Sequence, residues 1–173
     1  MNTDFTSETR AIFIDGLRNA HAMENQALSI MKPQVARIEN YPEVASRLQQ
    51  HIRETEGQIT RLESILSGFD KEPSTLKDTA LSMVGSLATI GHAMAGDEIL
   101  KNSFANYAFE NFEIAAYNSL LVLAQAGGLQ EAQQILQQNL SEEEAMAEWL
   151  EQNLPVVTLR YAELREAGQT AKS

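Results

Sequence analysis

The chain has 173 residues and no cysteine, which excludes a disulfide framework, a thiolate metal site and a cysteine nucleophile. Basic residues are scarce, with 13 Lys and Arg against 24 Asp and Glu, and the net charge is −11. This balance argues against binding to nucleic acid or to an anionic membrane surface. The first ten residues are polar and acidic, so we expect no signal peptide and a cytoplasmic protein.

Long hydrophobic runs and strand patterns are also absent. The longest weakly apolar stretch, residues 76–94, is interrupted by Lys77, Asp78 and His92, and it is not expected to span a membrane. No segment alternates apolar and polar residues as a strand does, and the 4 prolines and 9 glycines fall mainly at segment boundaries. An all-α fold is therefore predicted.

Apolar residues at spacings of three and four divide the chain into long helices. They are predicted at residues 7–38 (kinked at Pro33), 42–66, 97–126 and 129–153, with a connecting helix at 75–93 and a short last helix at 155–167. Short loops make two antiparallel hairpins, and the long connection between them can cross the bundle. We therefore predict a ferritin-like four-helix bundle as a single domain over 1–167, followed by a polar tail at 168–173.

Several acidic residues fall on the apolar faces of these helices. They are Glu24 in the first, Glu110 and Glu113 in the third and Glu143 in the fourth, while His51, Glu54 and Gln58 share one side of the second. Buried carboxylates are costly unless they are paired or neutralised, and two bound metal ions would supply the missing charge. Oxygen-rich ligands favour Fe or Mn over Zn or Cu.

Other interpretations of these residues stay open at this point. Most glutamates of a helical chain are solvated, and Arg18, Arg53 and Arg61 are alternative internal partners. His51 is the only histidine in reach of the proposed cluster, as a ligand or beside one. Residues 141–144 match a capping box, but we expect a continuous helix because the apolar spacing runs through them.

The segments at 54–63, 110–117 and 142–145, and more loosely the segment at 21–26, resemble the YciE/YciF family of bacterial ferritin-like proteins. The resemblance extends from about Phe5 to Leu154. It implies a ferritin-like homodimer with a rubrerythrin-like dinuclear Fe or Mn centre and a link to stress responses. The ligands that it implies are Glu24, Glu54, Glu110, Glu113 and Glu143, with Gln58 where family members often have His or Gln. The apolar stripe favours Glu143 over its neighbour Glu142.

Two functions follow as hypotheses. In the first, a dinuclear Fe or Mn centre reacts with O2 or peroxide, with an electron donor and a substrate that the sequence does not indicate. In the second, the bundle has lost its chemistry and acts as an interaction or stress-protective protein. The second is motivated by Gln58, by Asn111, where the family commonly has His, and by Ala147, near which many members have Asp.

Overall fold

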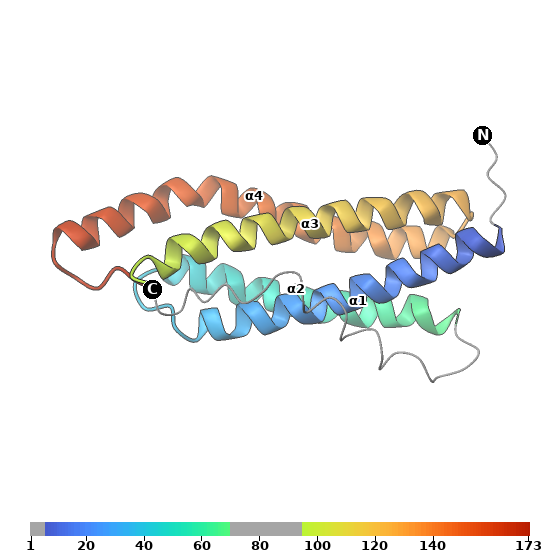
Figure 1. Cartoon of the computed structure of the whole chain (residues 1–173), viewed down its shortest axis with the longest axis horizontal. Coiled ribbons are helices and arrows are strands. Elements are labelled where there is room, and N and C mark those ends of the chain that lie inside the picture. The colour runs from blue at the N-terminus through green and yellow to red at the C-terminus, as the bar shows by residue number, and fades with distance from the viewer. Residues whose placement is uncertain (1–5, 70–94) are drawn as a thin grey trace.

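The computed structural model describes residues 6–69 and 95–173, and these residues form a bundle of α-helices (Figure 1). The helices are α1 (Ser7–Val35), α2 (Pro42–Ser67), α3 (Glu98–Ala126) and α4 (Gln130–Glu166). No strand occurs in the described parts of the chain, so the all-α prediction is confirmed. The expected connecting helix at 75–93 lies outside the described residues.

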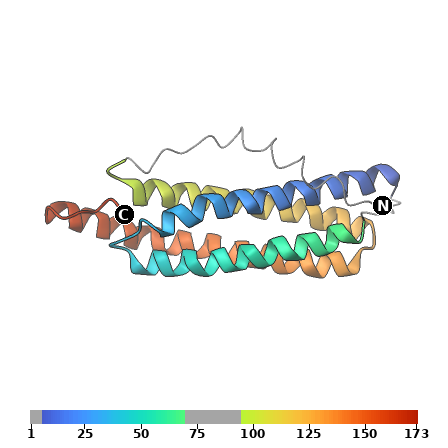
Figure 2. The same cartoon turned by 90° about the horizontal axis from the view of Figure 1, so that it is seen from below.

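The helices form two antiparallel hairpins that pack side by side. α1 packs on α2 and α3 on α4, and the hairpins meet through the pairs α1–α3 and α2–α4 (Figure 2). α2 ends and α3 begins at opposite ends of the bundle (Figure 1). This is the crossover arrangement expected of a ferritin-like bundle, not that of a simple up-down-up-down bundle.

The C-terminal part of the chain differs from the prediction. Instead of two helices separated near Pro155, α4 runs unbroken for 37 residues with Pro155 inside it. A proline removes one backbone hydrogen bond of a helix. Continuing the helix, however, buries Val157 and Leu164 against the same apolar cluster as Leu150, and this burial offsets the lost bond.

Two glycines end the helices of the second hairpin. Gly128 and Gly168 have φ values of 64° and 68°, a conformation that favours glycine. After Gly168 the chain folds back onto the bundle, where the Ile99 N–H donates to the Lys172 carbonyl at 2.8 Å and the Tyr41 hydroxyl donates to the Ala171 carbonyl at 2.8 Å. The segment predicted only as a polar tail is thus docked against the end of the bundle.

Two apolar clusters fill the interior, one containing Phe13 and Leu136 and the other containing Tyr41 and Leu150. Four buried glutamates, namely Glu24, Glu110, Glu113 and Glu143, lie between them along the helices. On α1, for example, Glu24 falls between Met23 of the first cluster and Ala27 of the second. A polar layer therefore divides the core. Among the described helices, none has a stretch long and apolar enough to cross a membrane.

Candidate metal centre

The polar layer is built from residues on the inward faces of the helices. Glu24, Glu113 and Glu143 are 0% exposed, and Glu110 is 3% exposed. Each continues the spacing of its apolar neighbours, as Glu143 does between Leu140 and Ala147, so a regular helix carries it into the core. The expected inward orientation of these four glutamates is confirmed, as is the continuity of α4 through residues 141–144.

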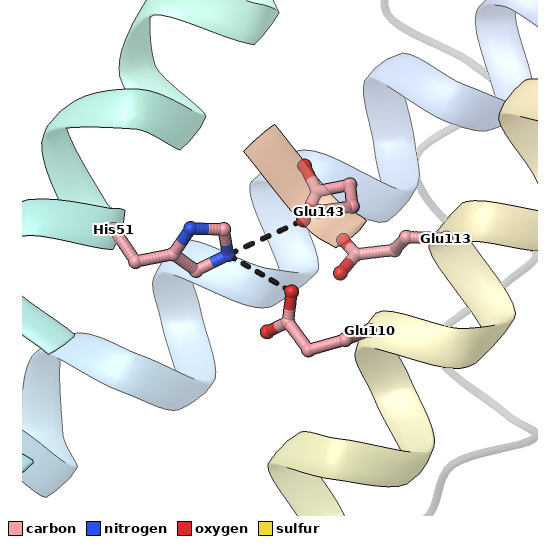
Figure 3. Close-up of side chains that lie close together, drawn as sticks. All are labelled: His51, Glu110, Glu113 and Glu143. Atoms are coloured by element: carbon pink, nitrogen blue, oxygen red, sulfur yellow. Dashed lines mark ion pairs between the residues drawn. The ribbon is translucent and has the colours of Figure 1, made fainter. Parts of the chain in front are cut away.

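His51 of α2 reaches the same layer and faces three of the glutamates (Figure 3). Its Nε2 atom lies 3.1 Å from Glu110 Oε2 and 3.3 Å from Glu143 Oε2. One ligand atom from each of His51, Glu110, Glu113 and Glu143 lies within 4.8 Å of the others, which is close enough for these residues to hold one metal ion together. We call these four residues the His51 group.

Several carboxylate oxygens of the layer have no hydrogen-bond donor. Within the described residues, no donor reaches Glu24 Oε2, Glu143 Oε1 or either oxygen of Glu113, and Glu110 Oε2 and Glu143 Oε2 have only the His51 Nε2 atom nearby. The His51 imidazole is the cation that the described part of the chain brings within ion-pair distance of Glu110 and Glu143. Buried acceptors in native proteins are almost always satisfied, so oxygens left in this way fit a bound cation.

The raised pKa values of the buried glutamates also indicate that the polar layer lacks positive charge. Burial raises the pKa of Glu24 to about 8, with a further contribution from the charge of Glu143. Burial also raises the pKa of Glu143 to about 7 and that of Glu113 well above its ordinary value, where Glu24 adds to the effect. These glutamates therefore hold protons near neutral pH unless a metal ion replaces them.

The pKa of His51 is raised, which favours the protonated imidazolium form. Burial by itself acts to lower this pKa, but Glu110, Glu143 and Glu54 outweigh burial and the pKa is raised well above its ordinary value. Without a metal ion, a protonated His51 thus supplies part of the charge that the carboxylates lack. With a metal ion on Nε2, the imidazole is neutral and this proton is released.

Glu54, an expected ligand, lies beside the layer and not within the His51 group. Its Oε2 atom accepts from Arg47 at 2.9 Å and lies 2.9 Å from His51 Nδ1, and its Oε1 atom accepts from Gln50 at 2.7 Å. Burial acts to raise the pKa of Glu54, but these partners lower it to about 2. In this structure His51 therefore contacts the buried glutamates directly, and Glu54 lies behind His51.

Gln58 is fully buried, and its Nε2 atom donates to Glu142 Oε2 at 3.0 Å. Its Oε1 atom has no donor among the described residues. Glu142 also pairs with Arg61 and is 22% exposed, so Glu143 is the one of the two neighbours that enters the layer.

The internal arginine partners considered from the sequence do not pair with the buried glutamates. Arg61 pairs with Glu142, Arg18 pairs with Asp15 at 3.2 Å, and Arg53 is exposed. The role of Glu24, Glu54, Gln58, Glu110, Glu113 and Glu143 as metal ligands stays a prediction.

The position of His51 could have been found from the spacing of α2. The buried residues of this helix follow one another at steps of three and four, namely Leu48, His51, Thr55, Gln58 and Leu62. Glu54 falls off this stripe, whereas His51 falls on it.

Comparison with known proteins gives the family. The model of a domain of unknown function (DUF892) matches residues 8–163. Protein YciF of Escherichia coli K12 is 26% identical over 145 residues, covering 78% of this chain and 82% of that protein. A crystal structure of a protein from Xanthomonas campestris pv. campestris matches with a TM-score of 0.74 and 31% identity, over 91% of this chain and 99% of that one. The resemblance seen in the sequence is thereby confirmed, and the chain belongs to the YciF family.

Proposed function

We propose that this protein binds iron or manganese in the polar layer of its bundle, at the His51 group. The observation that carries the proposal is the set of fully buried carboxylate oxygens without donors, on Glu113 above all, beside a histidine nitrogen that faces Glu110 and Glu143. A histidine with several carboxylates suits Fe or Mn, and the chain has no cysteine to favour a softer metal.

The number of carboxylates in the polar layer favours two bound ions over one. Glu24, Glu110, Glu113 and Glu143 together carry four negative charges when ionised, and two divalent ions would balance them. Glu24 is not in the His51 group, but it is fully buried in the same layer, where the charge of Glu143 raises its pKa and its own charge raises the pKa of Glu113. A second ion would be held by Glu24 together with carboxylates of the same layer.

The surrounding residues prepare the ligands for this role. Glu54 can accept the Nδ1 proton of His51, so that Nε2 is the atom left unprotonated toward the layer when the imidazole gives up its second proton to bind a metal ion. Arg47 and Gln50 in turn hold Glu54 in place. When bound, iron or manganese would supply one-electron chemistry with O2 or peroxide. Apolar clusters pack on both sides of the centre.

Metal analysis of paired variants tests the proposal. Protein from iron- or manganese-supplemented growth is expected to carry at least one ion per chain, and Glu143→Gln is expected to lose most of it. Glu144→Gln is the matched control, because it makes the same change at the next, exposed position of α4. A wild-type protein with less than about 0.2 ion per chain, and with no rise in Tm on addition of Fe(II), would contradict the proposal.

One observation favours the second hypothesis, a bundle without metal chemistry. Ala147 is buried one turn beyond Glu143 on α4 and offers no ligand. On this hypothesis Glu143→Gln is neutral or stabilises the purified protein whether or not metal is added, because it removes one of four buried acids that share a single histidine. On the metal hypothesis the same variant lowers the Tm of metal-loaded protein.

The homodimer, the cytoplasmic location and the stress role implied by composition and resemblance stay predictions. The mass of the purified chain in light scattering measures the first.

A further inference from the structure

A line of buried hydrogen bonds beside the centre joins all four helices. Arg61 Nε on α2 donates to Asn139 Oδ1 on α4 at 2.6 Å, and Asn139 Nδ2 donates to the Tyr117 oxygen on α3 at 3.0 Å. The Tyr117 hydroxyl then donates to Glu24 Oε1 on α1 at 2.5 Å. Asn139, Tyr117 and Glu24 are each 0% exposed, whereas the Arg61 side chain is 22% exposed. The metal proposal assigns no role to Arg61 or Asn139.

The direction of every bond in this line follows from Arg61. A guanidinium can only donate, so the atom of Asn139 that faces it must be the carbonyl oxygen. The amide nitrogen of Asn139 therefore faces Tyr117 and donates to it. Because its oxygen already accepts this bond, the Tyr117 hydroxyl directs its own proton to Glu24. One partly exposed arginine thus sets the orientation of a carboxylate on another helix.

Arg61 also anchors a second line. Its Nη2 atom bonds to Glu142 Oε2, and the same oxygen accepts from Gln58 Nε2 at 3.0 Å. The Gln58 amide is thereby turned so that its carbonyl oxygen is the free end. Each line ends on one buried oxygen without a donor in the described part of the chain, Glu24 Oε2 in the first and Gln58 Oε1 in the second.

We propose that Arg61 is the common positioning residue of the metal centre, acting through Asn139 and Tyr117 on Glu24 and through Glu142 on Gln58. It holds both side chains in single orientations in which Glu24 Oε2 and Gln58 Oε1 are the oxygens offered to the metal. This inference rests on the proposed function. It adds residues that do not touch the metal but determine how it is held, in the way that partners of metal ligands commonly do.

The inference is tested by metal binding to Arg61→Lys and Tyr117→Phe. A lysine lacks the forked guanidinium with which Arg61 contacts Asn139 and Glu142 at the same time. A phenylalanine at position 117 removes only the hydroxyl of Tyr117. We expect both variants to bind Mn(II) about 10- to 100-fold more weakly in calorimetry. We also expect a changed visible absorption spectrum of bound Co(II), which reports the ligand arrangement and which a change in stability alone does not alter.

Two matched controls accompany these variants. Arg53→Lys makes the same change at an exposed position of α2, and Tyr41→Phe removes another fully buried hydroxyl whose bond goes to the Ala171 carbonyl, away from the layer. Both are expected to keep the wild-type Mn(II) affinity and Co(II) spectrum. Helix content from circular dichroism verifies folding, and if Tyr117→Phe does not fold, the partly exposed Arg61→Lys decides.

The possible failures are distinguishable. If wild-type protein binds Mn(II) and Co(II) but Arg61→Lys shows an unchanged spectrum and affinity, the positioning role is wrong and the metal proposal stands. If wild-type protein binds neither ion, the metal proposal fails and this inference fails with it.

Discussion

Glu98 and Glu113 lie on the same helix and are both almost fully buried, at 1% and 0% exposure, yet their surroundings are opposite. Glu98 lies 2.7 Å from Arg37 and 3.3 Å from Lys172 of the docked tail. Burial acts to raise the pKa of Glu98, but these two cations lower it. Neither oxygen of Glu113 has a donor among the described residues, and burial with the charge of Glu24 raises its pKa well above the ordinary value.

The comparison shows two ways of burying a carboxylate. At the end of the bundle the chain supplies its own lysine and arginine, and the ion pairs attach the tail and the loop after α1 to α3. In the polar layer four glutamates share one histidine, so their charge requires either protons or bound cations. The first arrangement is suited to structure, and the second is suited to binding.

Among the tests of this difference between Glu98 and Glu113, metal addition is expected to change the free energy of unfolding most. Saturating Fe(II) or Mn(II) at about 1,000 times Kd is expected to add about 4 kcal/mol to the free energy of unfolding, because the ion binds only the folded chain. For a chain of this size, the corresponding rise in Tm is about 10 °C. Glu98→Gln is expected to keep this rise and Glu113→Gln to lose most of it in thermal unfolding. An equal rise in both variants would show that the ion binds elsewhere.

The second largest expected effect is the pH dependence of the stability of the metal-free protein. The pKa values of Glu143 and Glu24 are raised from 4.5 to about 7 and about 8, so the folded chain holds more protons than the unfolded chain between pH 5 and pH 8. The stability that these groups contribute is fully present below pH 4.5 and is lost as the pH rises through 7 and 8.

One extra proton in the folded state lowers the free energy of unfolding by about 1.4 kcal/mol per pH unit, or about 3 kcal/mol from pH 6 to pH 8. Urea unfolding in the presence of a chelator measures this loss. The lowered pKa of Glu98 has the opposite sign, because its contribution is present above the unfolded pKa of 4.5 and is lost as the pH falls through its folded pKa. Stability that stays level from pH 6 to pH 8 would contradict the protonated cluster.

Replacing each carboxylate by an amide in metal-free protein gives the smallest effects, with opposite signs. Glu98→Gln is expected to destabilise the fold by about 1 to 2 kcal/mol, less than a fully buried pair would cost because Arg37 and Lys172 remain partly exposed to water. Glu113→Gln is expected to be neutral or to stabilise by about 1 kcal/mol, because it removes an unpaired buried acid. Urea unfolding of both variants measures the difference, and destabilisation by both would remove the contrast.

Much of the site follows from helical spacing. Glu24, Glu110, Glu113 and Glu143 fall on apolar stripes, and a regular helix has to turn them inward with their neighbours. Glu54 shows the limit of this reasoning. Its place one turn from His51 does not determine its side-chain orientation, which here is set by Arg47, seven residues earlier on α2.

The boundary expected near Pro155 and the free tail show the same limit at larger scale. The signal for a break was local, whereas Val157, Leu164 and Ala171 are buried against residues distant in the sequence, including Tyr41 and Ile99. Burial of this kind is not encoded in a window of neighbouring residues, so it decides between two local structures that the sequence pattern leaves nearly equal.

By itself the sequence determined the all-α fold, the crossover between two hairpins and the acidic residues that enter the core, because these follow from spacing and loop length along one chain. Only the tertiary structure decided that His51 joins Glu110, Glu113 and Glu143, that Glu54 stands behind it, and that Arg61 reaches Glu24 through two other helices. The first and last of these depend on which side chains meet across helices, and the second depends on which neighbours on α2 pair with Glu54. In each case distance and charge, and not the order of residues, select the partner.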